Sequence, residues 1–374
     1  MSTDHHMNML MDNLERSSRV PLVPRPFRAC SRCVMDITAS EIVFDNKGHC
    51  NFCTIALQSL EEAKCDKSLL PAIVKDIKDK GKGQRYDVLI GLSGGVDSSM
   101  ALHHAVKLGL RPLCFTLETG WNTPQADENI MLLVEGLKVP LYRYVIDLEK
   151  FKSLQAAFLQ AGVKNIEIPT DHVLMAATYE LAAEHGIKYI LSGGNVATES
   201  IMPASWGYQA RDLKHIKAIY KQFVGKDLEG LPVCGLLKWN YYRWVVGLRT
   251  WYILDHYDYN RDESIEFLRQ QYGYKYPGEK HCESVYTWWF QNFYLFEKWG
   301  IDKRKAHYSS LVISGQITRE LAMESLGTNP EYPKIGLEDR ALKYPKHEYT
   351  DYPNDERRYK FIAACIRFLI HGFK

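Results

Sequence analysis

A segment rich in glycine and serine, Ser93 to Ser99 (SGGVDSS), limits what this 374-residue chain can fold into more than any other feature. The short apolar run 86–92 (YDVLIGL) precedes it and a helical pattern over residues 97–108 follows it, so we expect it to join a buried strand to a helix. Glycines let backbone N–H groups come close to a ligand, and the positive end of a helix favours anions. The segment therefore predicts a phosphate site where a strand ends.

The residues of this segment have separate expected roles. Gly94 and Gly95 allow phosphate oxygens to approach the backbone N–H groups without a Cβ atom in the way. Asp97 is expected to supply a hard oxygen ligand for Mg²⁺. Hydroxyl donors are expected from Ser93, Ser98 and Ser99. The segment is neither a Walker loop, G-x-x-x-x-G-K-[ST], nor a dinucleotide loop, G-x-G-x-x-G.

Strands and helices alternate around this segment. Further apolar strands and intervening helices are predicted at 111–117, 124–137, 141–146, 171–185 and 187–191. Alternation of this kind is typical of a parallel sheet with helical crossovers, and continuous apolar strands belong in the middle of such a sheet. We therefore predict an α/β fold with a doubly wound parallel sheet.

A second glycine-containing loop, Ser192-Gly193-Gly194-Asn195, follows the strand predicted at 187–191. In doubly wound sheets, ligands lie beyond the carboxyl ends of the strands. Gly193 and Gly194 can therefore face the same ligand as the first loop. A plain turn from strand to helix is the alternative.

Four of the nine cysteines have the spacing of metal ligands. Cys30-x2-Cys33 and Cys50-x2-Cys53 are separated by sixteen residues, which predicts a zinc site. Four protein ligands leave no open position, so the ion should be structural, and His49 should be a neighbour rather than a ligand. An iron–sulfur cluster or redox-active pairs are the alternatives.

The first loop resembles that of the PP-loop ATP pyrophosphatases, which cleave ATP between the α and β phosphates. The resemblance implies that ATP is bound by residues of both glycine loops and by the end of the second strand. These are Ser93, Gly94, Gly95, Val96, Asp97, Ser98, Ser99, Leu117, Gly193 and Gly194. In such enzymes Leu117-Glu118-Thr119-Gly120 would hold the adenine and ribose.

From about Cys30 to Leu326 the chain also resembles N-acetyl sugar amidotransferases, described as lipopolysaccharide or flagellin-sugar biosynthesis proteins. The segments that carry the resemblance are CSRCVMD, FDNKGHCNFC, IGLSGGVDSS, LETGWNTPQADENI, LSGGNVATES, YPGEKHCES and WGIDKRKAHYSSLVISGQITRE. The family activity implied is adenylation of an acetamido oxygen, followed by displacement of AMP by ammonia to give an acetamidino sugar for O-antigen or related polysaccharides. The substrate would be a nucleotide-linked N-acetyl sugar. Ammonia would come from glutaminase subunits that resemble those of imidazole glycerol phosphate synthase.

Several polar residues after the second loop are candidates for substrate contacts. With Asp97 and Ser93, the catalytic candidates are Glu283 and Lys280. The candidates for substrate binding are Lys280, His281, Lys303, Arg304 and Arg319. Glu199 is a weaker candidate near the second loop. A charged surface is the competing interpretation for each of these residues.

Two other functions stay open at this point. A PP-loop tRNA thiolase would also combine a zinc module with this loop, and Cys114 and Cys234 could form its sulfur-handling pair. A zinc-ribbon binding protein with an inactive nucleotide domain is the other, although the intact Asp97 and serines count against it.

Composition excludes some classes of protein. The 47 basic and 45 acidic residues give a net charge of +2, so the chain has no overall basic field and nucleic acid is an unlikely partner. No apolar run reaches the ~18–20 residues of a membrane-spanning helix, and the first residues lack a signal peptide pattern. We therefore expect no membrane partner and a cytoplasmic location.

The sequence predicts four regions. Residues 1–26 should be a flexible lead-in, and 27–80 a zinc-binding module with a linking helix. Residues 81–206 should form the PP-loop domain. Residues 207–374 should form a mostly helical, aromatic-rich domain that contacts the substrate or a partner, with most of its aromatic side chains in the core.

Overall fold

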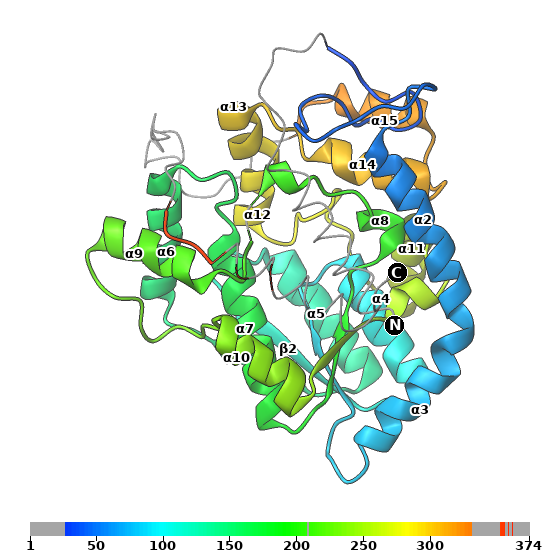
Figure 1. Ribbon diagram of the computed structural model, residues 1–374. Coiled ribbons are helices and arrows are strands. Elements are labelled where there is room, and N and C mark those ends of the chain that lie inside the picture. Colours follow the sequence, from blue (N-terminus) through cyan, green and yellow to red (C-terminus); the bar gives the residue numbers. More distant parts are fainter. Residues whose placement is uncertain (1–26, 208, 331–351, 356–357, 359–360, 362–374) are drawn as a thin grey trace.

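The computed structural model describes residues 27–207, 209–330, 352–355, 358 and 361. The expected lead-in, residues 1–26, lies outside this part of the chain. Five parallel strands form one sheet in the order β3-β2-β1-β4-β5, surrounded by helices (Figure 1). The strands are β1 (Val88–Gly91), β2 (Pro112–Glu118), β3 (Leu141–Val145), β4 (Tyr189–Ser192) and β5 (Arg249–Tyr252).

Helices cover both faces of the sheet, which confirms the predicted doubly wound fold. One face is covered by α3 (Leu70–Lys80), α4 (Val96–Lys107), α5 (Pro124–Leu137) and α11 (Arg261–Tyr272). The other is covered by α7 (Ile168–Glu184), α10 (Leu236–Asn240) and its π-helical continuation η3 (Tyr241–Val246). Val88 and Ile90 pack on the first face and Leu89 on the second, because successive side chains of a strand alternate.

The order of the strands reverses beside β1. The chain leaves β1 for β2 and β3 on one side and returns to β4 and β5 on the other. Sheets of this kind bind ligands beyond the carboxyl ends of the strands at the point of reversal. The loops that follow β1 and β4 both leave the sheet at this point.

Two elements were not predicted in full. β5 joins the sheet although it lies beyond residue 206, where we expected mainly helices. It has four residues among aromatics at helical spacings, so no strand pattern was visible. α7 starts at Ile168 rather than Asp171, because Pro169 suits the first turn of a helix. The earlier start makes Glu167 the N-cap residue of α7.

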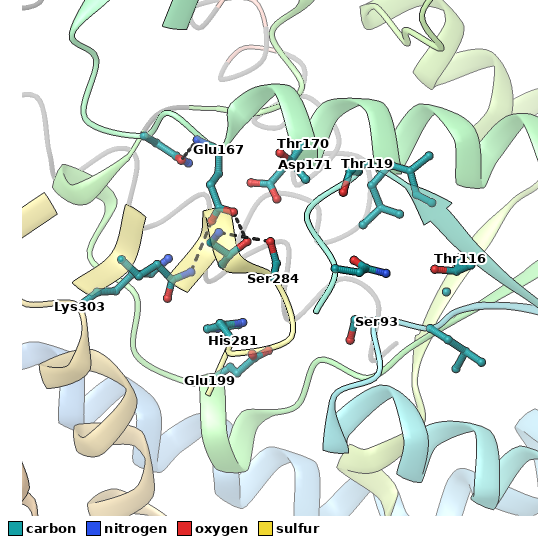
Figure 2. Close-up of a pocket in the computed structure, with 18 of the residues that line it drawn as sticks. Ser93, Thr116, Thr119, Glu167, Thr170, Asp171, Glu199, His281, Ser284 and Lys303 are labelled. Carbon is teal, nitrogen blue, oxygen red and sulfur yellow. Dashed lines mark hydrogen bonds between the residues drawn. The ribbon is translucent and has the colours of Figure 1, made fainter. Parts of the chain in front are cut away.

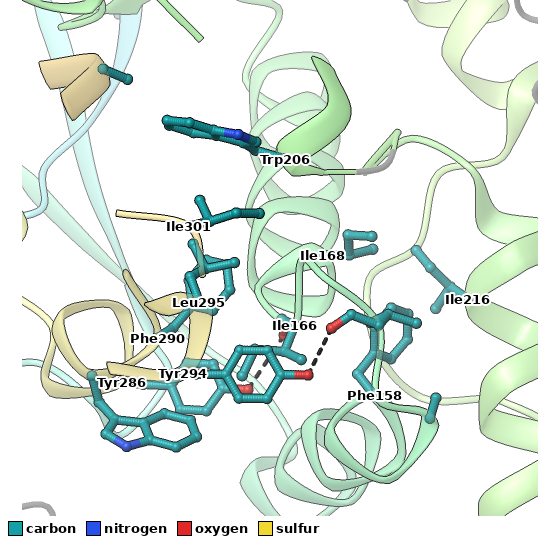
Figure 3. Packing of buried hydrophobic residues seen from close by; sticks show 14 of the residues in the cluster. Phe158, Ile166, Ile168, Trp206, Ile216, Tyr286, Phe290, Tyr294, Leu295 and Ile301 are labelled. Carbon is teal, nitrogen blue, oxygen red and sulfur yellow. Dashed lines mark hydrogen bonds between the residues drawn. The ribbon is translucent and has the colours of Figure 1, made fainter. Parts of the chain in front are cut away.

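Much of the aromatic-rich region forms core, as expected. α12 (Val285–Trp289), η5 (Phe290–Tyr294) and α13 (Leu295–Trp299) follow one another directly, and Trp289 and Tyr294 are fully buried. The Tyr294 hydroxyl donates to the carbonyl of Val163 at 2.8 Å, and that of Tyr286 donates to Ile166 at 3.3 Å (Figure 3). These bonds fix the segment that leads into α7.

The remaining helices connect these parts. They are α2 (Asn51–Asp66), η1 (Lys67–Leu69), α6 (Leu148–Ala161), α8 (Val196–Glu199), η2 (Ala204–Trp206), α9 (Leu213–Val224), η4 (Ile253–His256), α14 (Arg304–Ile313) and α15 (Arg319–Leu326). Within the described part of the chain, none of the helices combines the length and apolar character needed to cross a membrane.

The four cysteines form one buried cluster at the start of α2. The sulfur atoms of Cys30, Cys33, Cys50 and Cys53 lie within 4.8 Å of one another, with Cys30 and Cys53 at 3.8 Å and Cys33 and Cys50 at 3.6 Å. In a tetrahedral site with Zn–S bonds of about 2.3 Å, sulfur atoms are about 3.8 Å apart. The arrangement therefore fits a structural zinc ion held by four thiolates.

This zinc module, residues 27–50 with α2, packs on α14 and α15 (Figure 1). The backbone N–H of Val34 donates to the hydroxyl of Ser309 at 3.1 Å. The Arg319 guanidinium donates to the carbonyl oxygens of Cys33 at 3.1 Å and Cys30 at 3.2 Å. The zinc module is thus fastened to the C-terminal helices through its own cysteine backbone.

We predict that Cys30→Ser loses zinc and destabilises the protein, because three thiolates no longer close the site. Loss of a structural metal should remove a few kcal/mol of stability and lower the melting temperature by roughly 5 °C or more. Zinc content and thermal unfolding of the purified protein measure both effects.

His49→Gln is the matched control, since His49 lies beside Cys50 but outside the cluster of four. It should keep its zinc and its melting temperature. Full zinc occupancy and unchanged unfolding in Cys30→Ser would contradict the structural role.

Candidate active site

The loop after β1 and the loop after β4 lie against each other. A Cβ atom on Gly193 would stand 2.7 Å from the backbone nitrogen of Ser98 and 2.8 Å from the carbonyl carbon of Asp97. Gly94 has a φ of +81°, and a Cβ atom there would stand 2.4 Å from the carbonyl oxygen of Ala126. Glycine is therefore required at both positions, and the two predicted loops meet at one place.

α4 starts directly behind the first loop. Gly95 is its N-cap and offers no side chain to the N–H groups of the first turn, which leaves the positive end of the helix available to an anion. The hydroxyls of Ser93 and Ser98 lie 3.3 Å apart beside it. Ser99 is placed differently from our expectation, because it is buried and donates to the Gly95 carbonyl at 2.8 Å. Ser99 therefore stabilises the loop from its buried side and does not face a ligand.

Lys280 lies between two carboxylates of the site. Its Nζ is 2.7 Å from Oε1 of Glu199 and 3.7 Å from Oδ2 of Asp97. Burial lowers the pKa of Lys280, but Glu199 and Asp97 more than offset this, so its pKa is raised. The Tyr259 hydroxyl donates to Asp97. Burial raises the pKa of Asp97 and the charge on Lys280 opposes that shift.

Glu283 adds a third carboxylate at the same place. It lies so close to the first loop that a Cβ atom on Gly95 would be 2.2 Å from its Oε1. Burial and the nearby charge on Asp97 raise the pKa of Glu283 to about 7. Three carboxylates, those of Asp97, Glu199 and Glu283, line one cavity, and hard oxygen donors of this kind suit Mg²⁺.

Two adjoining cavities lie beyond the carboxyl ends of the strands. The loop compartment, of about 340 Å³, is lined by both glycine loops. The α7 compartment, of about 520 Å³, extends from the ends of β1 and β2 to the start of α7. They share wall residues, among them Ser93, Glu199, His281 and Ser284. We therefore treat them as two halves of one cleft (Figure 2).

Most predicted contact residues line this cleft. Lys280 faces the loop compartment, Lys303 and Leu117 face the α7 compartment, and His281 faces both. His281 has a φ of +67°, a strained conformation for a non-glycine residue. Burial, followed by the charges on Lys280 and Lys303, lowers the pKa of His281 to about 3, so its ring is neutral.

Two predicted residues are engaged elsewhere. Arg304 pairs with Asp302 at 2.8 Å and donates to the carbonyl of Thr328 at 2.7 Å, although it also lines a small side cavity. Arg319 holds the cysteine backbone of the zinc module and lines neither compartment of the cleft. The structure therefore does not bring Arg319 to the cleft with the other predicted residues, because α15 contacts the N-terminal module, which sequence spacing did not show.

Sequence reasoning missed several residues of the cleft. Asp171 had been assigned to helix formation only, and Glu167 to no predicted element, but both lie at the start of α7 and line the cleft. Thr287 and Gln291 lie among the aromatics of α12 and η5, and Arg261 opens α11 beside the loop compartment. Glu167 and Asp171 are four residues apart, a spacing that places two side chains on one face of a helix. Only the folded chain shows that this face borders the cleft.

The two cysteines considered for sulfur transfer lie apart. Cys114 is buried on the face of the sheet covered by α4 and α5, and Cys234 on the face covered by α7. Burial raises the pKa of Cys114 to about 12 and that of Cys234 to about 11. Two neutral thiols on opposite faces do not form a sulfur-handling pair, so that expectation is wrong.

A segment that lines part of this cleft matches a protein-family model. Residues 283–365 match the model described as "LPS biosynthesis protein WbpG-like, C-terminal domain". The segment is similar to that domain, and we call it the WbpG-like segment. The match confirms the resemblance to lipopolysaccharide biosynthesis proteins that the sequence motifs indicated. The WbpG-like segment contributes to the cleft the residues Glu283, Ser284, Thr287, Gln291, Lys303 and His307.

Other comparisons give weaker similarity. No curated protein sequence matches the chain at a significant level. The NH3-dependent NAD synthetase of Campylobacter jejuni subsp. jejuni is 17% identical over 37% of this chain and 58% of its own, with a TM-score of 0.27. NMN synthetase from Francisella tularensis is 18% identical over 60% of this chain and 99% of its own, with a TM-score of 0.29. The chain thus spans less than two thirds of that NAD synthetase, and the fold assignment depends on its own strand order.

We predict that Gly193→Ala weakens binding of ATP, the ligand expected from the loop sequences. The added Cβ must push the backbone of Ser98 and Asp97 away, and a displacement of about 1 Å in a catalytic site can reduce activity about 100-fold. Calorimetric titration with Mg·ATP measures the loss of ATP affinity relative to the unmodified protein.

Gly207→Ala is the control, because Gly207 lines neither compartment. Its Cβ would stand 3.6 Å from the side chain of Asn165, an ordinary van der Waals contact. Equal affinity in both variants would show that the contact between the loops does not shape the site.

Proposed function

We propose that this protein is an ATP-dependent amidotransferase that converts the acetamido group of a nucleotide-linked N-acetyl sugar into an acetamidino group. One observation carries the proposal. The glycine loop expected to bind ATP and the WbpG-like segment form opposite walls of a single cleft. The loop expected to bind phosphate thus lines the same cleft as residues of the WbpG-like segment.

The loop compartment would hold the phosphates of ATP. The first turn of α4 and the hydroxyl of Ser93 are positioned to donate to phosphate oxygens. The Ser98 hydroxyl lies beside them and donates to the Gly95 carbonyl at 3.2 Å, so it would turn toward a bound phosphate. Asp97, with Glu199 and Glu283 nearby, would hold Mg²⁺, which when bound neutralises phosphate charge. The ends of β1 and β2, including Leu117, would receive the adenine and ribose, as the PP-loop resemblance implies.

The α7 compartment would hold the sugar. Its volume of about 520 Å³ is within the range of about 300–1,000 Å³ typical of small-molecule sites. Its walls offer hydroxyl, amide, imidazole and charged groups from Thr287, Gln291, His281 and Lys303, which suit the many hydroxyl and amide groups of such a sugar.

The reaction would proceed in two steps. The amide oxygen of the acetamido group attacks the α-phosphorus of ATP, and pyrophosphate leaves. Ammonia then attacks the imidate carbon and AMP leaves with the original oxygen. Lys280 is placed to stabilise the negative charge that develops on the phosphates, since fixed charges in a closed site act without reorganisation. Positioning the two substrates supplies the rest of the acceleration.

We propose that ammonia reaches the cleft from separate glutaminase subunits that resemble those of imidazole glycerol phosphate synthase. The support for this partner is the family resemblance of the sequence motifs. The product would enter O-antigen or a related surface polysaccharide.

The direct test incubates the protein with ATP, Mg²⁺, an ammonium salt and a nucleotide-linked diacetamido sugar. We expect AMP, pyrophosphate and a sugar product lighter by the difference between an oxygen atom and an NH group. Chromatography with mass spectrometry detects all three. If AMP formed only with tRNA and a sulfur donor, the protein would instead be a thiolase.

We predict that Asp97→Asn reduces AMP formation by about 10²–10³-fold, the usual effect of removing one preorganised electrostatic group. Folding should be nearly unaffected, since Lys280 keeps its ion pair with Glu199. Steady-state rates and thermal unfolding are the two measurements.

Glu149→Gln serves as the control for Asp97→Asn. Glu149 is also the second residue of a helix, α6, but its side chain is 90% exposed and lines neither compartment. The Glu149→Gln variant should form AMP at the same rate as the unmodified protein. Full turnover by Asp97→Asn would remove the first loop from the mechanism.

A further inference from the structure

Two acidic side chains at the start of α7 face the α7 compartment without a role in the mechanism described above. Glu167 is the N-cap of α7 and Asp171 follows one turn later, so both carboxylates lie on the same face of the helix. Figure 2 shows Asp171 directed into the cavity, with Glu167 beside it. Neither side chain caps α7, because no side-chain bond to its first turn exists.

Glu167 is held in place by the opposite wall. The hydroxyl of Thr287 donates to its Oε1, and the side-chain amide of Gln291 donates to its Oε2 at 3.5 Å. Both partners come from the WbpG-like segment. Within the described part of the chain, the carboxylate of Asp171 accepts no hydrogen bond, and the residue is exposed to the cavity. Asp171 is therefore the member of the pair that a small ligand can reach.

The charges around the pair are unbalanced. The positive group that acts on both carboxylates is Lys303, which leaves two potential negative charges beside one ammonium group. Burial and then the charge on Glu167 raise the pKa of Asp171 to about 7, against the opposing effect of Lys303. Burial likewise raises the pKa of Glu167. Asp171 can thus accept a proton near neutral pH.

A further polar group in this compartment is unsatisfied. Ser200 lines the cavity and is 4% exposed, and its hydroxyl has no hydrogen-bond partner among the described residues. A buried hydroxyl without a partner is costly unless a ligand or water completes its bonding. The carboxylates of Asp171 and Glu167 favour a cation as a ligand of this compartment.

We propose that Asp171, oriented beside Glu167, binds ammonium in the α7 compartment and takes its proton, so that ammonia can attack the adenylated acetamido group. The inference rests on the proposed function. Ammonia is the nucleophile of that reaction. At neutral pH it is present mostly as the ammonium cation, whose nitrogen has no free electron pair until a proton leaves.

The protons and electrons balance without any oxidant or reductant. An N–H bond of ammonium breaks, its electron pair stays on nitrogen, and the proton passes to the carboxylate of Asp171. The freed pair forms the C–N bond, and the C–O bond to AMP breaks with its pair on oxygen. A second proton leaves the new nitrogen as the amidinium forms, and it returns through the carboxylate pair to water.

The test compares two nucleophiles in Asp171→Asn. With ammonium chloride at neutral pH, AMP formation should fall by about 10²-fold or more, since general bases contribute roughly 10²–10⁴-fold. Hydroxylamine is uncharged at neutral pH and needs no deprotonation before attack, so its reaction should be largely retained. The defect with ammonium should shrink as the pH approaches the pKa of ammonium, where free ammonia accumulates.

Glu167→Gln should show the same selectivity in a weaker form, because it removes the neighbouring charge and leaves Asp171 in place. Glu180→Gln is the matched control. Glu180 is a carboxylate of the same helix, but it pairs with Lys238 outside the cleft. It should react normally with both nucleophiles, and melting temperatures of all variants check that they fold.

Two outcomes overturn the inference. Equal loss with both nucleophiles in Asp171→Asn would mean that Asp171 positions the sugar, and unchanged rates with both would mean that it takes no part. Either result leaves the amidotransferase proposal intact, provided the unmodified protein forms AMP and the amidine. If the unmodified protein forms neither with either nucleophile, the proposed function itself fails and the inference fails with it.

Discussion

The contact between two strand-end loops determines most of what this molecule can bind. Gly193 lies against the backbone of Asp97 and Ser98 so closely that no Cβ atom fits. The contact exists because the strand order reverses between β1 and β4, which brings two loops far apart in sequence to one edge of the sheet. Asp97 and the open end of α4 thereby face a single cavity, and every other residue of the site is placed relative to them.

The second wall of the cleft depends on interactions from outside the sheet. Lys303 and the start of α14 reach the cleft because α14 is held by α8 on one side and by the zinc module on the other. Arg319 adds a link between α15 and the cysteine backbone. The buried tyrosines of α12 and η5 fix the entry to α7 in a similar way. A module near the beginning of the chain thus supports cleft-lining residues that come from α14 and the residue before it.

The cleft is acidic although the chain as a whole is nearly neutral. Six acidic residues line it, against the cationic groups of Lys280, Lys303 and Arg261. They are Asp97, Glu167, Asp171, Glu199, Glu279 and Glu283. Such a field repels a bare nucleotide and attracts cations. Under the proposed function, this negative potential favours ATP bound as its magnesium complex in the loop compartment. The same potential favours ammonium in the α7 compartment.

The sequence alone determined the elements with strong local signals. The glycine loops, the cysteine quartet and four of the five strands were all visible, because turn chemistry, metal-ligand spacing and apolar runs are local properties. It did not determine that β5 completes the sheet, that Ser99 and Arg319 brace structure, or that Glu167 and Asp171 face the site. Apart from that of Ser99, which bonds to Gly95 in its own loop, those roles depend on contacts between segments distant in sequence, such as that between Glu167 and Thr287. Only tertiary packing decides which face of a helix borders the cleft.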